Sequence, residues 1–167
     1  MAAKTAGNFR ASGVIGIGDL TDHGTTKLHD LGFRCKAKDL GATGYGWGEF
    51  VYLGGCAATA RGSVVLIKDD YGTSLLVARD AGAVAVALSA CIAGEYGWYQ
   101  VLGTGVAACD TVAANAACYI DGTAGRIDDA AVAGDQIIGM RTVTADDTNT
   151  CVVTMATYPA VADFDNA

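Results

Sequence analysis

Short apolar runs separated by glycine- and aspartate-rich turns recur along the chain from residue 45 onward. Phe50–Leu53 is β-branched and aromatic and is followed by two glycines, which is typical of a strand that ends in a turn. Ser63–Ile67 and Ser74–Ala78 flank Asp69–Thr73, where aspartate and glycine supply the chemistry of a tight turn. These runs predict one strand followed by a hairpin.

The segment Val84–Ile92 alternates large and small side chains with a period of two. A strand places the large residues on one face, whereas a helix scatters them, so the pattern favours a strand. Residues 107–117 are rich enough in alanine to be helical, and the sequence leaves that segment open. Further strands are predicted at Trp98–Leu102, Val112–Ala117, Cys118–Ile120, Gln136–Gly139, Arg141–Val143 and Thr150–Met155.

Together these strands predict an all-β fold, a small antiparallel β-sandwich or barrel with an extended N-terminal arm. Residues 1–44 lack sustained periodicity, apart from one short apolar run at Val14–Ile17, and are assigned to the arm. Residues 45–167 are assigned to a β-rich structural domain.

The apolar content consists mainly of small side chains. The chain has 31 alanines and 23 glycines, but only 4 phenylalanines, 3 methionines and 2 tryptophans. Each small side chain buries little area, at about 25 cal/mol per Å² of apolar surface. A lone domain of this composition has a thin core, so burial against partner subunits is favoured. Trp98, at a glycine turn that opens an apolar run, is predicted to be buried in that core.

Two tripeptides of the same sequence precede apolar runs, Tyr45-Gly46-Trp47 and Tyr96-Gly97-Trp98. One interpretation is an ancient duplication. The other is two similar junctions between a turn and a strand, which we favour because one tripeptide does not establish a repeat.

The net charge of −7 is unevenly distributed along the chain. Residues 1–41 carry six basic and four acidic groups, a net charge of +2, whereas residues 42–167 carry five basic and fourteen acidic groups, a net charge of −9. An acidic body repels phosphates, which argues against nucleic-acid binding. The basic arm favours contact with a separate surface, and the alternative is a chance fluctuation of a few charges.

The six cysteines are predicted to be free, buried thiols. None forms a Cys-x-x-Cys pair and the N-terminus shows no apolar signal core, so synthesis in a reducing cytoplasm is expected. The alternative for an even cysteine count is three disulfides. No continuous apolar run reaches the roughly 18–20 residues of a membrane span, so no membrane contact is expected.

No residue pattern meets the requirements of a catalytic or cofactor site. Gly16-Ile17-Gly18 lacks the third glycine and the following helix of a dinucleotide-binding turn. His23 and His29 are the only histidines, and their spacing provides no shared ligand position on a helix or strand. Glu49 and Glu95 flank aromatic turns, where carboxylates are common. We expect no enzyme activity, no cofactor and no metal.

Several turn-and-strand motifs follow one another in a defined order: Gly48–Leu53, Gly62–Val65, Gly97–Val101, Gly122–Asp129, Ala133–Gly139 and Tyr158-Pro159. In this order they resemble the capsid decoration (cement) proteins of tailed bacteriophages, over about residues 45–160. The cysteine content and the long segment before residue 45 depart from that pattern.

The resemblance implies a virion structural protein that binds the outside of the capsid shell and stabilises it by bridging major capsid protein subunits. It also implies self-association, with a homotrimer favoured, and it brings no catalytic residues. The alternative is a virion fibre or adhesin module that recognises a host surface glycan or protein. Its binding platform would be the aromatic residues at turn edges, Trp47, Trp98 and Tyr99.

The N-terminal arm is the predicted docking element. An arm with little periodic structure gains order by lying along a partner, where apolar anchors fill pockets and basic groups meet acidic patches. We expect residues 1–44 to contact the shell or a neighbouring subunit, while the body from residue 45 folds and self-associates without them. The predicted contact residues are Phe9, Arg10, Lys27, Phe33, Arg34, Lys36 and Lys38.

Overall fold

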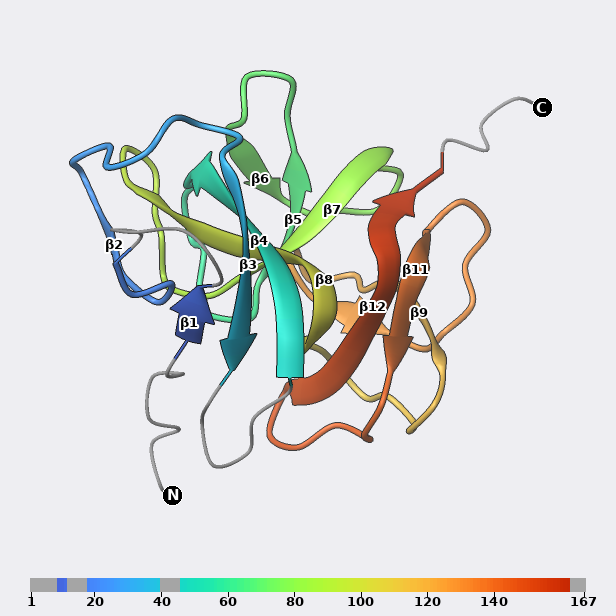
Figure 1. Cartoon of the computed structure of the whole chain (residues 1–167). Helices are drawn as coiled ribbons and strands as arrows, with labels where there is room; N and C mark the ends of the chain where they lie inside the picture. The colour runs from blue at the N-terminus through green and yellow to red at the C-terminus, as the bar shows by residue number, and fades with distance from the viewer. Residues whose placement is uncertain (1–8, 12–17, 40–45, 163–167) are drawn as a thin grey trace.

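Twelve β-strands make up the regular structure of the protein (Figure 1). A computed structural model describes the backbone of residues 9–11 and all of residues 18–39 and 46–162, and these residues contain no helix. Every pairing between strands is antiparallel, which confirms the predicted all-β, antiparallel fold. The strands are β1 (Phe9–Ala11), β2 (His23–Gly24), β3 (Arg34–Asp39), β4 (Gly46–Gly54), β5 (Val64–Ile67), β6 (Thr73–Leu75), β7 (Gly82–Ala87), β8 (Tyr96–Ala108), β9 (Ala117–Ile120), β10 (Ile127–Asp128), β11 (Gln136–Thr142) and β12 (Thr150–Val161).

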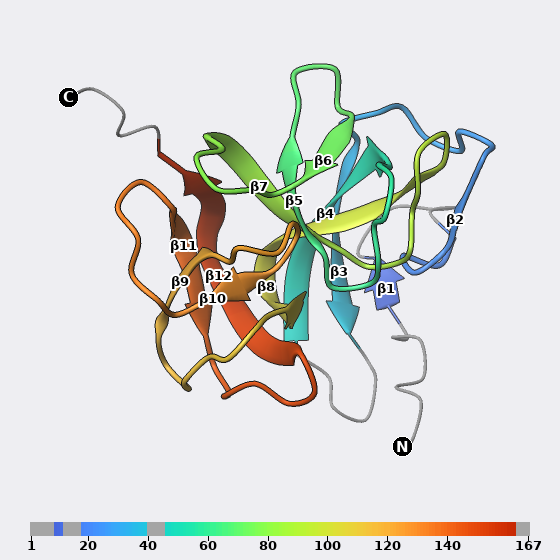
Figure 2. The same ribbon diagram turned by 180° about the vertical axis from the view of Figure 1, so that it is seen from behind.

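One sheet connects all of these strands, in the main order β1-β3-β4-β8-β7-β12-β11-β9-β10. Strand β2 pairs with β8, and β5 pairs with β6 and β7. The long strands β8 and β12 also pair with each other, so each of β7, β8 and β12 is bonded to the other two. Three mutually paired strands cannot lie in one plane. The sheet therefore curls where they meet, as the front and back views show (Figures 1 and 2).

The bend in β8 lies between the part that pairs with β7 and the part that pairs with β12. Gly103, at the bend, has a φ of +96°, and a Cβ there would lie 2.5 Å from the backbone oxygen of Trp47. This position therefore requires glycine. The buried Gln100 bridges the bend, since its Nε2 donates to the carbonyl oxygens of Leu102 and Thr104 at 3.1 and 3.0 Å.

The β4–β8 pair is buried on both faces at its Gly54–Tyr96 end. Phe50, Tyr52 and Trp98 belong to one hydrophobic cluster. Their chain neighbours, including Val51 and Tyr99, belong to a second cluster with residues of β5 and β7. Because successive side chains of a strand point to opposite faces, both clusters form from the same pair of strands. The buried Trp98, which is 2 % exposed, confirms the prediction for this residue.

The C-terminal half encloses a third cluster, built from small and medium side chains. Its members are mostly valine, isoleucine, methionine and cysteine, and the described ones include no aromatic residue. Val84 and Val86 of β7 point into this cluster, whereas Ala85 and Ala87 point into the second one. The predicted alternation in β7 is therefore present, although the strand ends at Ala87 and both of its faces are buried.

The alanine-rich stretch at residues 107–117, whose conformation the sequence leaves open, is not helical. Strand β8 continues to Ala108, and residues 110–116 form turns and irregular structure before β9 begins. The predicted strand at Val112–Ala117 is thus wrong, and Cys118–Ile120 is correct. The hydroxyl of Thr142 donates to the carbonyl oxygen of Ala113 at 2.7 Å and accepts from the backbone N–H of Ala116 at 2.7 Å, and these bonds hold the irregular segment in place.

The described part of the predicted arm, residues 18–39, is integrated into the domain. All six residues of β3 pair with β4, and β1 pairs in turn with β3. Leu20 is buried in the cluster around Trp98. The boundary predicted at residues 44 and 45 lies in the connection between two paired strands. The described residues before position 45 therefore pack against the body, and the independent folding of the body stays a prediction. Within the described residues, no helix is long and apolar enough to span a bilayer.

Candidate binding surface

A row of three cations lies along one face of β3. Arg34, Lys36 and Lys38 are exposed, while Cys35 and Ala37 between them are buried in the cluster around Trp98. The alternation follows from the pleat, which sends successive side chains to opposite faces. Positions two apart along a strand are about 6.5–7 Å from each other, so the row extends over about 13 Å.

Strand β4 lies beside this row in antiparallel register. Lys38 is opposite Trp47, and Lys36 is opposite Glu49. The Lys36 Nζ atom lies 2.9 Å from Glu49 Oε1. Directly opposed residues of an antiparallel pair share one face, so the three cations, the tryptophan and the glutamate form one surface.

Tyr158 of β12 completes this surface from the other side of β4. Its hydroxyl donates to Glu49 Oε2. The guanidinium carbon of Arg34 lies 5.0 Å from the centre of the Tyr158 ring, in cation–π distance. We call the set Arg34, Lys36, Lys38, Trp47, Glu49 and Tyr158 the basic-aromatic face.

The carboxylate at the centre of this face is stabilised in its charged form. The hydrogen bond from Tyr158 and then that from Lys36 lower the pKa of Glu49. The same hydrogen bonds raise the pKa of Lys36 and of Tyr158. Glu49 is therefore ionised and Lys36 is charged at neutral pH, and the face keeps a net charge of +2 from three cations and one anion.

A cavity of about 280 Å³ opens on the basic-aromatic face beside Trp47. Trp47 is 57 % exposed, and Leu102 of β8 provides a second apolar wall. Lys36 and Glu49 provide the polar walls, and Gly48 lies between them. The cavity can take one apolar or amphipathic side chain of a partner, with charged groups at its edge.

The structure brings together three of the predicted contact residues, Arg34, Lys36 and Lys38. Lys27 and Phe33 lie elsewhere, in the loop between β2 and β3. The Phe33 ring stacks on His29 at 5.5 Å and contacts the edge of Trp98 at 6.0 Å, so it covers the core.

Phe9 and Arg10 belong to β1, where they pair with Asp39 and Lys38; their side chains lie outside the described part. Glu49 and Tyr158 were not predicted as contact residues, because 109 positions separate them and only the sheet brings them together.

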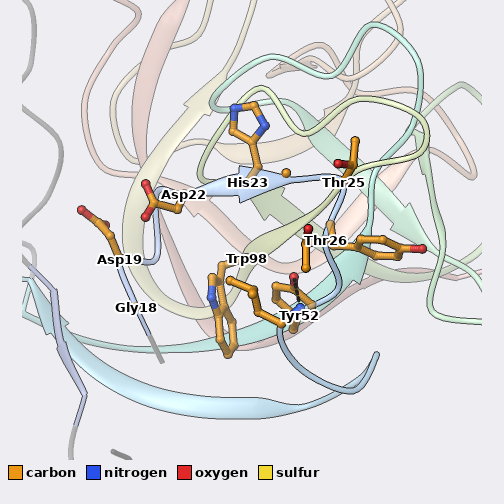
Figure 3. A pocket seen from close by; sticks show the side chains of 11 residues that line it. Gly18, Asp19, Asp22, His23, Thr25, Thr26, Tyr52 and Trp98 are labelled. Carbon is orange, nitrogen blue, oxygen red and sulfur yellow. Dashed lines mark hydrogen bonds between the residues drawn. The ribbon is translucent and has the colours of Figure 1, made fainter. Parts of the chain in front are cut away.

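A larger pocket, of about 410 Å³, lies on β2 and its flanking loops (Figure 3). Asp19 and Asp22 lie at one end and Thr25 and Thr26 at the other, with Tyr52, Tyr96 and Trp98 from β4 and β8 also lining it. His23 Nδ1 lies 2.9 Å from Glu95 Oε2, and this pair holds β2 against β8. Trp98 and Tyr99 are buried, which corrects the expectation that they form an exposed aromatic platform; Trp47 is exposed.

Each of the six cysteines is a free thiol, and five of them are buried as predicted, whereas Cys56 is half-buried. Burial raises the pKa of Cys35 to about 11 and that of Cys118 to about 12. Burial is also the main cause that raises the pKa of Cys91, Cys109 and Cys151. Since the thiolate is the nucleophile and the metal ligand, these five groups are in the unreactive form at neutral pH. Among the described residues, no three histidine, cysteine or acidic side chains come together as a metal site would require.

Comparison with known proteins adds no relative. No protein-family model matches the chain, and no curated protein matches its sequence.

Proposed function

We propose that the protein is a virion structural protein that binds the outside of a tailed-phage capsid and stabilises the shell by bridging major capsid protein subunits. The observation that carries the proposal is the basic-aromatic face on an otherwise acidic β scaffold. Residues 46–162 carry five basic and twelve acidic groups, a net charge of −7, whereas the cations of β3 are gathered on one face. A gathered, exposed set of this kind is suited to binding a large partner surface.

The order of the turn-and-strand motifs supports the same proposal, since it resembles that of capsid decoration proteins over about residues 45–160. The motifs occupy β4, β5, β8, β10, β11 and the end of β12, which are elements of one continuous sheet. A protein that binds only the assembled shell shifts the assembly equilibrium by mass action. Contacts of about 1,200–2,000 Å² suffice for each stable interface.

A structural function also agrees with the state of the reactive groups. Five of the six thiols are buried with raised pKa values, and the carboxylate of Glu49 is held in an ion pair and a hydrogen bond. A nucleophile needs an adjacent base and access to substrate. We therefore propose that the chain has no enzymatic activity, and an activity screen unaffected by Glu49→Gln and Glu95→Gln would support this.

Self-association is part of the proposal, with a trimer favoured. The C-terminal half, whose core holds only small and medium side chains, exposes several apolar residues: Val132, Ile138 and Val143. Burial of such residues between subunits would remove more apolar surface from water and so add to the stabilisation that the small core provides. Sedimentation equilibrium of the free protein would test this, and a monomer at micromolar concentration would contradict it.

The decisive experiment is reconstitution on expanded shells that lack the protein. We expect saturable, stoichiometric binding and a rise in the melting temperature of the shell. Unexpanded shells serve as the control, because they test whether the protein recognises only the expanded state of the shell. Absence of saturable binding to the shells would contradict the proposal.

The pocket of Figure 3 supports a second candidate function, that of a virion fibre or adhesin module for a host surface glycan. The half-buried Tyr96 offers one ring for an apolar sugar face, and the carboxylates and hydroxyls of the pocket can bond sugar hydroxyls. Binding to host cells or to a glycan array that is lost in Asp22→Asn and retained in Asp70→Asn would favour this function over shell binding.

A further inference from the structure

The basic-aromatic face contains two cations without an ion-pair partner among the described residues. Lys36 is paired with Glu49, whereas Arg34 and Lys38 form no salt bridge in the described chain. Arg34 stacks on the Tyr158 ring, and its charge contributes to the lowered pKa of Glu49 without a salt bridge between the two side chains. Arg34 and Lys38 lie four residues apart on one strand, which places their Cα atoms about 13 Å from each other.

The apolar part of the face lies beside the half of this row that holds Lys36 and Lys38. Trp47 is directly opposite Lys38, and the cavity beside it is lined by Lys36 and Leu102. Exposed tryptophans next to a cavity are the kind of residue that contributes most to binding at protein interfaces. The pairing of β3 with β4 fixes the register of these positions, with Lys36 opposite Glu49 and Lys38 opposite Trp47.

We infer that the basic-aromatic face is the surface that docks on the shell, and that its partner is an acidic protein segment. The segment presents two carboxylates about 13 Å apart, to Arg34 and Lys38, and between them an apolar side chain that enters the cavity beside Trp47. This inference rests on the proposed function and moves the docking element from the arm as a whole to one face of the sheet. Complementary charge steers the encounter, and the apolar contact in the centre slows dissociation.

Single-stranded nucleic acid is the other partner class that uses cations and an exposed aromatic ring. The charges favour protein, since a protein that binds nucleic acid tightly makes about 6–10 phosphate contacts. Only three cations lie on this face, and the chain as a whole carries −7. An acidic protein segment needs no more than the two unpaired cations.

The test uses the full-length chain and expanded empty shells, with binding measured at increasing salt. Arg34→Glu combined with Lys38→Glu is expected to weaken binding by about 10–100-fold and to reduce its salt dependence. Trp47→Ala is expected to weaken binding about 10-fold with the salt dependence kept. The matched control, Arg61→Glu with Lys68→Glu, changes the net charge equally on exposed residues outside the face and should alter affinity by less than about 3-fold. Each variant should melt within about 2 °C of wild type before the binding data are compared.

Zero-length carbodiimide cross-linking provides a readout that does not depend on variant stability. Lys38 should be joined to an aspartate or glutamate of the major capsid protein in the mass spectra of decorated shells. If the Arg34→Glu/Lys38→Glu variant and the Trp47→Ala variant both bind shells with wild-type affinity, the inference is overturned and the proposed function still stands. An equal loss in the control pair would overturn it as well, by showing a general charge effect. If the wild type binds a single-stranded oligonucleotide tightly and Trp47→Ala abolishes that binding, the partner is nucleic acid and the inference of an acidic protein segment is overturned. If wild type itself does not bind shells, the proposed function fails.

Discussion

The tryptophans of the two Tyr-Gly-Trp motifs lie at opposite ends of the same pair of strands, and one is buried while the other is exposed. Trp98, at the start of β8, is 2 % exposed, whereas Trp47, near the start of β4, is 57 % exposed. Because β4 and β8 are antiparallel, Trp98 pairs with Tyr52 at one end of the ladder, and Trp47 lies at the other end. Identical local sequence therefore does not determine burial.

The difference arises from what covers each end of the strand pair. The loop between β2 and β3 lies over Trp98, where His29 lies at 5.3 Å and Phe33 at 6.0 Å between ring centres. Leu20 fills the same cluster from the segment before β2. At the other end, among the described residues, Trp47 has the open cavity beside it. A large aromatic residue thus packs in the core at one end and lies on the exposed basic-aromatic face at the other.

Replacing each tryptophan by alanine should give the largest contrast. Trp98→Ala should lower the free energy of unfolding by about 3–5 kcal/mol, because it leaves a large cavity in an aromatic cluster. Trp47→Ala should change it by no more than about 0.5 kcal/mol, as for exposed residues elsewhere. Thermal unfolding would check both, since each kcal/mol shifts Tm by roughly 2–4 °C at this chain length. Equal shifts in the two variants would show that Trp47 is covered in solution.

Shortening one side chain of the segment that covers Trp98 should have the next largest effect on the free energy of unfolding. Leu20→Ala should destabilise the protein by about 2–4 kcal/mol, because its buried side chain packs in the cluster around Trp98. The matched control is Leu28→Ala in the neighbouring loop, where the side chain is 68 % exposed and little change is expected. Chemical denaturation with tryptophan fluorescence would measure both. Wild-type stability of Leu20→Ala would mean that residues before β2 do not support the core.

Thiol labelling should distinguish local opening around Cys35, in the cluster around Trp98, from local opening around Cys118, in the cluster of the C-terminal half. Under native conditions Cys35 should be alkylated before Cys118, because Cys35 lies under the irregular segment 18–33, whereas Cys118 is enclosed by strands. A segment with few regular backbone hydrogen bonds opens locally at a lower free energy than a segment held in a sheet. Mass spectrometry over a time course would follow each site, and the unfolded chain should take up six labels without prior reduction. Intact disulfides in fresh protein would contradict the free-thiol assignment.

The smallest effect is expected for the ion pair on the basic-aromatic face. The pKa of Glu49 is lowered in the folded protein, so its contribution to stability is present above the ordinary pKa of glutamate and is lost as the pH falls through the lowered value. Glu49→Gln should remove this part of the pH dependence and shift Tm at neutral pH by no more than about 2 °C, because Lys36 is exposed. Melting curves between pH 3 and pH 7 would check it. An undiminished pH dependence in the variant would assign the effect to another carboxylate.

Much of the strand pattern was predictable from neighbouring residues alone. The turn between β5 and β6 was predicted from Asp70 and Gly72, and the Asp70 carboxylate does accept the backbone N–H of Gly72 at 2.9 Å. The failure at residues 112–116 has a different cause. Side chains from distant strands, such as Thr142, hold that segment in an irregular conformation and override its local preference.

The candidate surface was predictable only in part. Arg34, Lys36 and Lys38 were among the predicted contact residues, but the segment that carries them was assigned to an arm because it lacks sustained periodicity. Leu20, Leu31 and Cys35, its members of the core cluster, follow no single period. Their burial depends on contact with Tyr52 and Trp98, which lie far along the chain. Lack of periodicity in a segment therefore does not indicate that it lies outside the core.

By itself the sequence determined the all-β, antiparallel class of this protein and the hairpin at β5–β6. These features depend on residues within a few positions of one another, where the pleat and the turn chemistry act directly. Only the tertiary structure decided which tryptophan is buried and which is exposed. It also joined Lys36, Glu49 and Tyr158, which belong to three strands. Those outcomes depend on how strands distant in sequence pair and cover one another, and local patterns do not encode which segment provides the cover.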